Sequence, residues 1–221
     1  MRAGRFSDAD PVLFDLDGTL TASGPGIISS VRYALAKMGQ PALDDEALGR
    51  FIGPPLLDSF RDFCGFDPAE VTVAIAAYRE YYATDGQYEN SVYDGIPELL
   101  TSLRGAGRTL AVATSKAEVF AESILEHFGL TGYFATIVGS ELDGRRTAKS
   151  EIITEALGRM DRPAAGTVMV GDRSHDVRGA VTVGVRSIGV LWGYGDDAEL
   201  TGAGADALAA TPAELMAQLT G

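Results

Sequence analysis

Two aspartates occupy the end of a short apolar run near the beginning of the sequence. Residues 12–16 read as a buried strand, and Asp15 and Asp17 stand where this strand ends. A carboxylate beside a hydrophobic core is costly unless a cation, hydrogen bonds or a reaction uses it. The pair therefore indicates a functional site.

More polar residues follow later apolar runs. Thr114 ends the run "TLAVAT", and Ser115 follows it directly. Asp172 ends the run "TVMVGD", and Asp176 comes four residues later. Lys149 precedes a segment with a helical pattern. Each residue alone is typical of a helix cap, a turn or a solvated surface. Together they fall at the carboxyl ends of expected parallel strands, where ligands bind in such sheets. We therefore expect one cleft to collect them.

Phosphoryl transfer through an aspartyl phosphate is the chemistry that these residue types favour. Asp15 would attack phosphorus. Asp17 would protonate the leaving alkoxide and later deprotonate the attacking water. Gly18 permits the tight turn after the strand. The phosphate is expected to contact Gly18, Thr114, Ser115 and Lys149, because hydroxyl, backbone N–H and ammonium groups stabilise its oxygens.

Charge balance predicts a metal ion at the same place. A phosphate dianion would be repelled by Asp15, Asp172 and Asp176. An oxygen-ligated Mg²⁺ held by Asp15, Asp172 and a backbone carbonyl offsets most of that repulsion. Mg²⁺ is therefore the expected cofactor.

The elements that must position these residues follow from hydrophobic periodicity. From Tyr93 onward, short β-branched runs alternate with helical patterns, which indicates a Rossmann-like parallel sheet covered by helices on both faces. Between the first strand and Asn90 the pattern is helical, with no strand signal. The sequence therefore predicts an α/β core of residues 1–21 and 93–221, interrupted by a small all-helical cap domain of residues 22–92.

Composition narrows the functional classes. The chain has 221 residues, a net charge of −13 and one cysteine, Cys64. A surface this acidic disfavours nucleic acid, because phosphate neutralisation dominates that affinity. No apolar run is long enough for a membrane helix, and no signal peptide is apparent. We expect a cytoplasmic protein, a monomer or homodimer, that acts on a small phosphorylated substrate.

The motifs together resemble those of the haloacid dehalogenase superfamily, in its phosphoglycolate-phosphatase-like branch. "DLDGTLT" resembles the first motif, "VATSK" the second, Lys149 the third and "GDRSHD" the fourth. The resemblance implies that Asp15 is the nucleophile and Asp17 the acid/base. It also implies that the Asp17 main-chain carbonyl and Asp172 bind Mg²⁺, and that Asp176 binds it from a second layer or through water. The helical insertion resembles the mobile cap of the family, and an acid at Asp17 favours phosphatases over dehalogenases.

Other functions are compatible with the same motifs. A phosphohexose mutase with the same core would return the phosphoryl group to a sugar, and a non-hydrolytic phosphoacceptor or binding protein would keep it. A signalling receiver domain has a different motif order and no helical insertion. The substrate is not identified. Gly53, in a Gly-Pro-Pro loop, is a candidate substrate contact, with Arg50 as a possible anion contact. Trp192 is expected to pack near the site.

Overall fold

The computed structural model describes residues 6–221, which form two compact units. One unit comprises the chain up to Leu20 together with Val92–Gly221, and the other comprises Thr21–Ser91. The sequence places these boundaries one residue further along the chain. That the second unit acts as a cap stays a prediction.

A six-stranded parallel sheet forms the centre of the larger unit, in the order β3-β2-β1-β4-β5-β6. Its strands are apolar on both faces, because helices cover both. The first strand lies in the middle, and its neighbours are the second and fourth strands. The strands are β1 (Val12–Phe14), β2 (Leu110–Ala117), β3 (Thr136–Ser140), β4 (Val168–Gly171), β5 (Arg186–Val190) and β6 (Ala207–Ala209).

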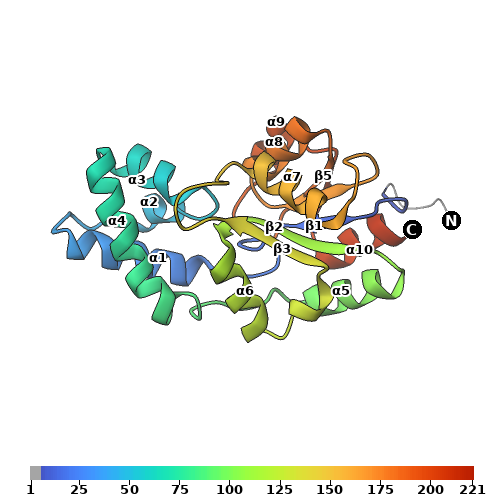
Figure 1. Ribbon diagram of the computed structural model, residues 1–221, viewed down its shortest axis with the longest axis horizontal. Helices are drawn as coiled ribbons and strands as arrows, with labels where there is room; N and C mark the ends of the chain where they lie inside the picture. The colour runs from blue at the N-terminus through green and yellow to red at the C-terminus, as the bar shows by residue number, and fades with distance from the viewer. Residues whose placement is uncertain (1–5) are drawn as a thin grey trace. The chain divides into compact units, whose positions relative to one another are not determined.

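The helices of this unit divide between the two faces of the sheet (Figure 1). Helices α5 (Ile96–Gly105), α6 (Glu118–His127) and α10 (Pro212–Thr220) lie on one face, with the 3₁₀ turn η2 (Thr131–Tyr133). Helices α7 (Lys149–Met160) and α8 (Ser174–Val183) lie on the other, with α9 (Asp197–Ala203) against α8. The expected Rossmann-like α/β core is confirmed.

The packing under α7 and α8 fixes the strand ends that carry the polar residues. Leu13 of β1, Ala113 of β2 and Met169 of β4 are fully buried against Ile153 of α7 and Ala180 of α8. Burying such side chains contributes about 1.5–3 kcal/mol each for the larger ones. Because the three strands share this core, their carboxyl ends are held at one edge of the sheet.

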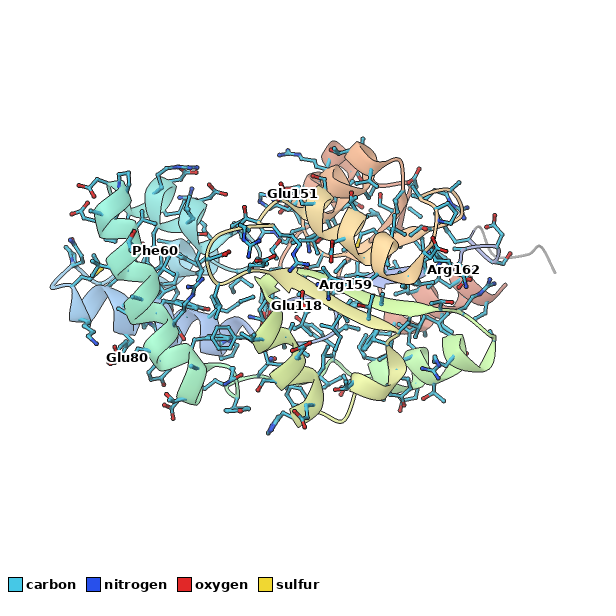
Figure 2. The ribbon with its side chains drawn as sticks, in the orientation of Figure 1. Phe60, Glu80, Glu118, Glu151, Arg159 and Arg162 are labelled. Atoms are coloured by element: carbon cyan, nitrogen blue, oxygen red, sulfur yellow. The ribbon has the colours of Figure 1, made fainter. Side chains whose placement is uncertain are left out.

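The exposed edge of the sheet at β3 is closed by an ion pair. Glu118 at the start of α6 accepts a hydrogen bond from the Gly139 amide at 3.1 Å, and Arg159 of α7 donates to the Ile137 carbonyl at 3.1 Å. The two side chains also pair with each other at 3.0 Å (Figure 2). Satisfied backbone groups protect an edge strand from pairing with another chain.

The smaller unit contains helices and no strand across residues 22–90, all of which the structure describes. A π-helical turn follows its last long helix, and a Cβ on Gly26 would lie 1.8 Å from the Gly86 carbonyl oxygen, so the two segments touch through backbone. Phe51 and Phe60 pack edge to face in its core. The elements are α1 (Gly24–Lys37), α2 (Asp45–Gly49), α3 (Leu56–Cys64), α4 (Pro68–Tyr81) and η1 (Tyr82–Gly86).

Several short elements had no counterpart in the sequence prediction. Helices α2 and α9 and strand β6 have five, seven and three residues, too few to show a clear period. Helix α3 has nine residues and directly follows the Gly-Pro-Pro segment, which interrupts the helical pattern. Among the described residues, none of the helices combines the length and the apolar character that a membrane crossing requires.

Candidate active site

Asp15 and Lys149 form the centre of the site. The Asp15 amide donates to the Val170 carbonyl at 2.9 Å, which places the carboxylate just beyond the junction of β1 and β4. Lys149 is the first residue of α7, and its Nζ lies 2.8 Å from Asp15 Oδ1, 2.7 Å from Asp176 Oδ1 and 3.1 Å from the Ala113 carbonyl oxygen. One buried ammonium group thus joins three elements.

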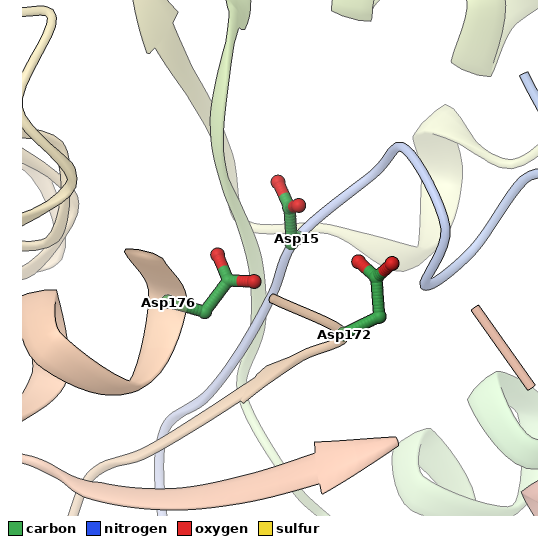
Figure 3. A group of neighbouring side chains, drawn as sticks. All are labelled: Asp15, Asp172 and Asp176. Atoms are coloured by element: carbon green, nitrogen blue, oxygen red, sulfur yellow. The ribbon is translucent and has the colours of Figure 1, made fainter. Parts of the chain in front are cut away.

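Asp172 and Asp176 complete an acidic cluster with Asp15. The three carboxylates converge on one space (Figure 3), and one oxygen of each lies within 4.8 Å of the others. Asp172 Oδ2 accepts from the Tyr194 amide at 2.8 Å, and its Oδ1 accepts from the Thr19 hydroxyl at 3.3 Å. These bonds fix Asp172 although it is fully buried.

Burial and like charge perturb the protonation of this cluster. Desolvation, followed by the charges of Asp176 and Asp15, raises the pKa of Asp172 well above its usual range. Desolvation also raises the pKa of Asp176 to about 6, against the lowering effect of Lys149. For Lys149, burial alone would lower the pKa, but the charges of Asp15 and Asp176 outweigh burial and raise it. Strongly perturbed acids in one cluster are typical of functional sites.

Glycines let the backbone approach these acids. Gly18 has φ +84°, and a Cβ there would lie 2.1 Å from Asp172 Oδ2. A Cβ on Gly171 would lie 2.2 Å from Asp176 Cγ, and one on Gly193 would lie 2.3 Å from the Gly18 carbonyl oxygen. Any larger residue at these positions would displace a carboxylate or the turn after β1.

Asp17 faces a different partner, Lys116. The Lys116 Nζ lies 2.9 Å from Asp17 Oδ2, and both side chains are almost fully buried. The other oxygen, Asp17 Oδ1, is buried and accepts no hydrogen bond. Lys116 belongs to the second motif, but no role was predicted for it, although its position directly after Thr114 and Ser115 was an available signal.

The remaining predicted contacts fall in different places. Thr114 is buried on β2, next to the carbonyl group that binds Lys149, and its Oγ1 accepts from the Lys116 amide at 3.3 Å. The carbonyl of Ser115 accepts from the Ser140 hydroxyl at 2.9 Å. Gly53 belongs to the helical unit, so its role in substrate binding stays a prediction.

Two further contributions came from distant parts of the chain. Glu199 of α9 accepts from the Ser174 amide at 2.7 Å and from Arg173 Nε at 3.0 Å, which holds the loop between Asp172 and Asp176. The Trp192 indole N–H donates to the Thr19 carbonyl at 3.0 Å, so Trp192 supports the turn after β1. Trp192 was expected to pack near the site, whereas nothing in the sequence linked Glu199 to it.

The donor set fits a divalent cation. Among residues 6–221, four buried carboxylates, of Asp15, Asp17, Asp172 and Asp176, face two ammonium groups, of Lys116 and Lys149. When these groups are ionised, two negative charges remain uncompensated. Carboxylate and carbonyl oxygens are the ligands that Mg²⁺ prefers. The Asp15–Asp172–Asp176 cluster therefore suits Mg²⁺ better than a soft metal, which would favour sulfur or imidazole ligands.

Comparison with known proteins now identifies the family. The family described as Haloacid dehalogenase-like hydrolase matches residues 12–190, which contain Asp17 and all three acids of the cluster. The chain belongs to the haloacid dehalogenase-like hydrolases. The resemblance stated from its motifs is thereby confirmed.

Relatives within the haloacid dehalogenase-like hydrolases carry several names. A 5′-nucleotidase of Pseudomonas aeruginosa is 50% identical over 86% of both chains. Tyrosine-protein kinase PtkA of Mycobacterium tuberculosis is 46% identical over 83% of this chain and 62% of its own length. A phosphoglycolate phosphatase of Cupriavidus necator is 32% identical over 95% and 92%.

A solved structure agrees with the fold of this haloacid dehalogenase-like hydrolase. A protein of Clostridium acetobutylicum, described as a predicted phosphatase, superposes with a TM-score of 0.92 and 46% identity, covering 94% of this chain and 96% of the other. The expectation that the chain is a hydrolase of this family with phosphatase relatives is confirmed.

Proposed function

We propose that the protein is a Mg²⁺-dependent phosphomonoesterase that hydrolyses a small phosphorylated metabolite through an aspartyl phosphate on Asp15. The observation that carries the proposal is the buried contact of Asp15 with Lys149, beside two further acids and two residues before Asp17 in the sequence. Nucleophile, cation and acid/base thus meet at one strand end. We also propose that it acts in the cytoplasm, as a monomer or homodimer.

The side chains of the site divide the reaction into two steps. In the first, the Asp15 carboxylate attacks phosphorus, the ester P–O bond breaks, and Asp17 gives its proton to the leaving alkoxide. In the second, Asp17 takes a proton from a water molecule that attacks phosphorus, which releases inorganic phosphate and restores Asp15. Lys149 and the Thr114 hydroxyl bind phosphate oxygens throughout.

The metal requirement rests on the excess of carboxylates. Asp15, Asp172 and the main-chain carbonyl of Asp17 would hold Mg²⁺. Asp176 would contact the ion from a second layer or through water. When bound, the ion supplies positive charge that offsets the repulsion between the substrate phosphate and these acids. Residues 21–91 would act as the cap that excludes water from the site.

A nucleoside 5′-monophosphate is the first substrate class to test. The support is the 5′-nucleotidase relative, which is 50% identical over 86% of both chains. The relative named phosphoglycolate phosphatase makes phosphoglycolate the second class, at lower identity. Both are phosphate esters of an aliphatic alcohol, so both need a proton on the leaving oxygen.

A second candidate function follows from the relative named tyrosine-protein kinase PtkA. The phosphoryl group on Asp15 would then pass to a tyrosine hydroxyl of a protein in place of water. The buried Lys149–Asp15 site is equally suited to water and to a tyrosine hydroxyl as the acceptor of the phosphoryl group. The fate of the phosphoryl group therefore decides between the two functions.

The test is phosphate release from a panel of phosphomonoesters, with Mg²⁺ and with a chelator. Wild type is compared with Asp15→Asn and with Asp45→Asn, an exposed acid of the helical unit that serves as the matched control. We expect Mg²⁺-dependent release of free phosphate by wild type and the control, and none by Asp15→Asn. Turnover that survives chelation or Asp15→Asn would refute the proposal. Retention of phosphate on protein tyrosines, with little free phosphate, would favour the kinase alternative.

A further inference from the structure

Lys116 is unusual in both its position and its surroundings. The chain contains three lysines, Lys37, Lys116 and Lys149, and two of them are buried at the same strand ends. Lysine is rarely buried unless its ammonium group is paired with an acid or accepted by hydrogen bonds. Lys149 contacts Asp15, whereas Lys116 contacts Asp17. Each of the two aspartates after β1 therefore has its own ammonium group.

The contact with Lys116 leaves the two oxygens of Asp17 in different states. Oδ2 receives the ammonium group at 2.9 Å, with the side chains of Lys116 and Asp17 only 6% and 10% exposed. Oδ1 is buried and has no hydrogen-bond partner. A buried carboxylate oxygen without a partner is costly, so an oxygen left in this state is typical of a site where a reacting group binds.

The backbone around Lys116 explains how the side chain is directed to Asp17. The pairing of β2 with β3 shifts register between Ala113 and Ala117, so the C-terminal end of β2 departs from regular strand geometry. Within this irregular stretch the Lys116 amide donates to Thr114 Oγ1 at 3.3 Å. Irregular strand ends of this kind often redirect a side chain next to an active site.

We propose that Lys116 is a positioning residue that holds Asp17 by Oδ2 and presents Oδ1 to the leaving group and then to the attacking water. The inference rests on the proposed function. Without the ammonium group the Asp17 carboxylate can rotate, and a displacement of about 1 Å of a reacting group can cost about 100-fold in rate.

A purely stabilising role is a poor explanation for this pair. Desolvation of two charges offsets most of their attraction, so a buried ion pair contributes little net stability compared with apolar side chains of the same size. An ion pair that leaves one oxygen without a partner is weaker still. The contact is better explained by a requirement for a fixed orientation of the Asp17 carboxylate than by a contribution to stability.

The experiment is a double-mutant cycle on Lys116 and Asp17. Wild type, Lys116→Met, Asp17→Asn and the double variant are compared by kcat/KM for the best alkyl phosphate of the panel. If Lys116 acts through Asp17, each single change lowers kcat/KM, by about 10- to 100-fold for Lys116→Met, and the double variant is no slower than Asp17→Asn. Lys37→Met, on an exposed lysine, is the matched control and stays near wild type.

A second readout separates positioning from a general disturbance of the site. For a two-step reaction, kcat/KM reports the first step, in which Asp17 protonates the leaving group. p-Nitrophenolate leaves without a proton, so Lys116→Met should lower kcat/KM for p-nitrophenyl phosphate by less than about 3-fold, far less than for the alkyl phosphate. Lys116→Arg keeps the charge and should recover a large part of the alkyl phosphate activity.

The outcomes are distinct. Multiplicative losses in the double variant, or equal losses for the alkyl and aryl phosphates, would overturn the role of Lys116 and leave the proposed function standing. Absence of turnover by wild type on every ester would overturn the proposed function and this inference with it. Thermal unfolding checks that each variant is folded, and Lys116→Gln replaces the methionine variant in the cycle if that variant is not.

Discussion

Lys149→Met removes a buried charge while leaving both of its acidic partners in place. The Lys149 ammonium lies 2.8 Å from Asp15 and 2.7 Å from Asp176, and all three side chains are at most 7% exposed. Methionine has nearly the same length and fills the same volume, so the change leaves no large cavity. Its effect therefore measures the electrostatic role of the lysine.

The magnitude follows from the burial of the pair. Removing one partner of a buried ion pair costs about 3–5 kcal/mol, because the remaining charge is desolvated without compensation. A protein of this size loses about 2–4 °C in Tm for each kcal/mol. We therefore expect Lys149→Met to lower the Tm of the metal-free protein by about 6–20 °C.

The assay is thermal unfolding in a chelator at pH 8, where the acids are most strongly ionised. Lys37→Met is the matched control, because Lys37 and Glu80 form an ion pair in which both side chains are about half exposed. Exposed pairs contribute about 0–1 kcal/mol, so this control should change Tm by no more than about 4 °C.

A third variant makes the reasoning refutable. In Lys149→Met/Asp176→Asn one of the two uncompensated acids is neutral, so part of the lost Tm should return. If Lys149→Met lowers Tm no more than Lys37→Met, or if the second change lowers Tm further, the charge of Lys149 does not stabilise the acidic cluster and the electrostatic account of the site is wrong.

Other predictions concern the same cluster. Asp172→Asn should raise the Tm of the metal-free protein by about 2–4 °C, corresponding to about 1 kcal/mol, because one of the mutually repelling charges is removed while the Thr19 hydroxyl can reverse its hydrogen bond; a fall in Tm would contradict this. Added Mg²⁺ should raise the Tm of wild type and have little effect on Asp172→Asn, as a titration in the same assay would show. Gly193→Ala, whose Cβ would lie 2.4 Å from Asp172 Cβ, should cost about 1–3 kcal/mol in chemical denaturation, whereas Gly105→Ala, with open space around it, should cost nothing. Because the pKa of Asp176 is raised to about 6, the folded metal-free protein takes up a proton there that the unfolded chain binds only near pH 4. Its free energy of unfolding should therefore increase when the pH is lowered from 8 to 5, and that of Asp176→Asn should increase less. An equal increase in both proteins would refute the assignment.

Much of this site could be predicted because strand ends are readable in the sequence. The apolar runs before Asp15 and Asp172 have the length and composition of buried parallel strands, and such strands end at one edge of a sheet. The spacing of apolar residues after Lys149 predicts the helix that begins there, and the first residue of this helix lies at the same edge. Local patterns therefore sufficed for these residues.

The rest depends on contacts that no local pattern encodes. The pairing of Lys116 with Asp17 requires the irregular end of β2, and strand register shifts leave no simple periodic signal. Glu199 reaches the loop after Asp172 from a seven-residue helix that was not predicted. These residues are joined by tertiary packing, which becomes visible only when the fold is known.

The central position of β1 has a consequence for how the chain folds. Val12 pairs with Leu110 on one side and with Val168 on the other, so the strand that leads to Asp15 has partners only far along the chain. Contacts of such long range slow folding, because loop-closure entropy is lost before pairing repays it. During synthesis the apolar strand β1 emerges before β2 and stays unpaired until β2, its first partner along the chain, has left the ribosome. The arrangement that gathers the acidic side chains at the middle of the sheet thus delays the pairing of β1 until β2 and β4 have been synthesised.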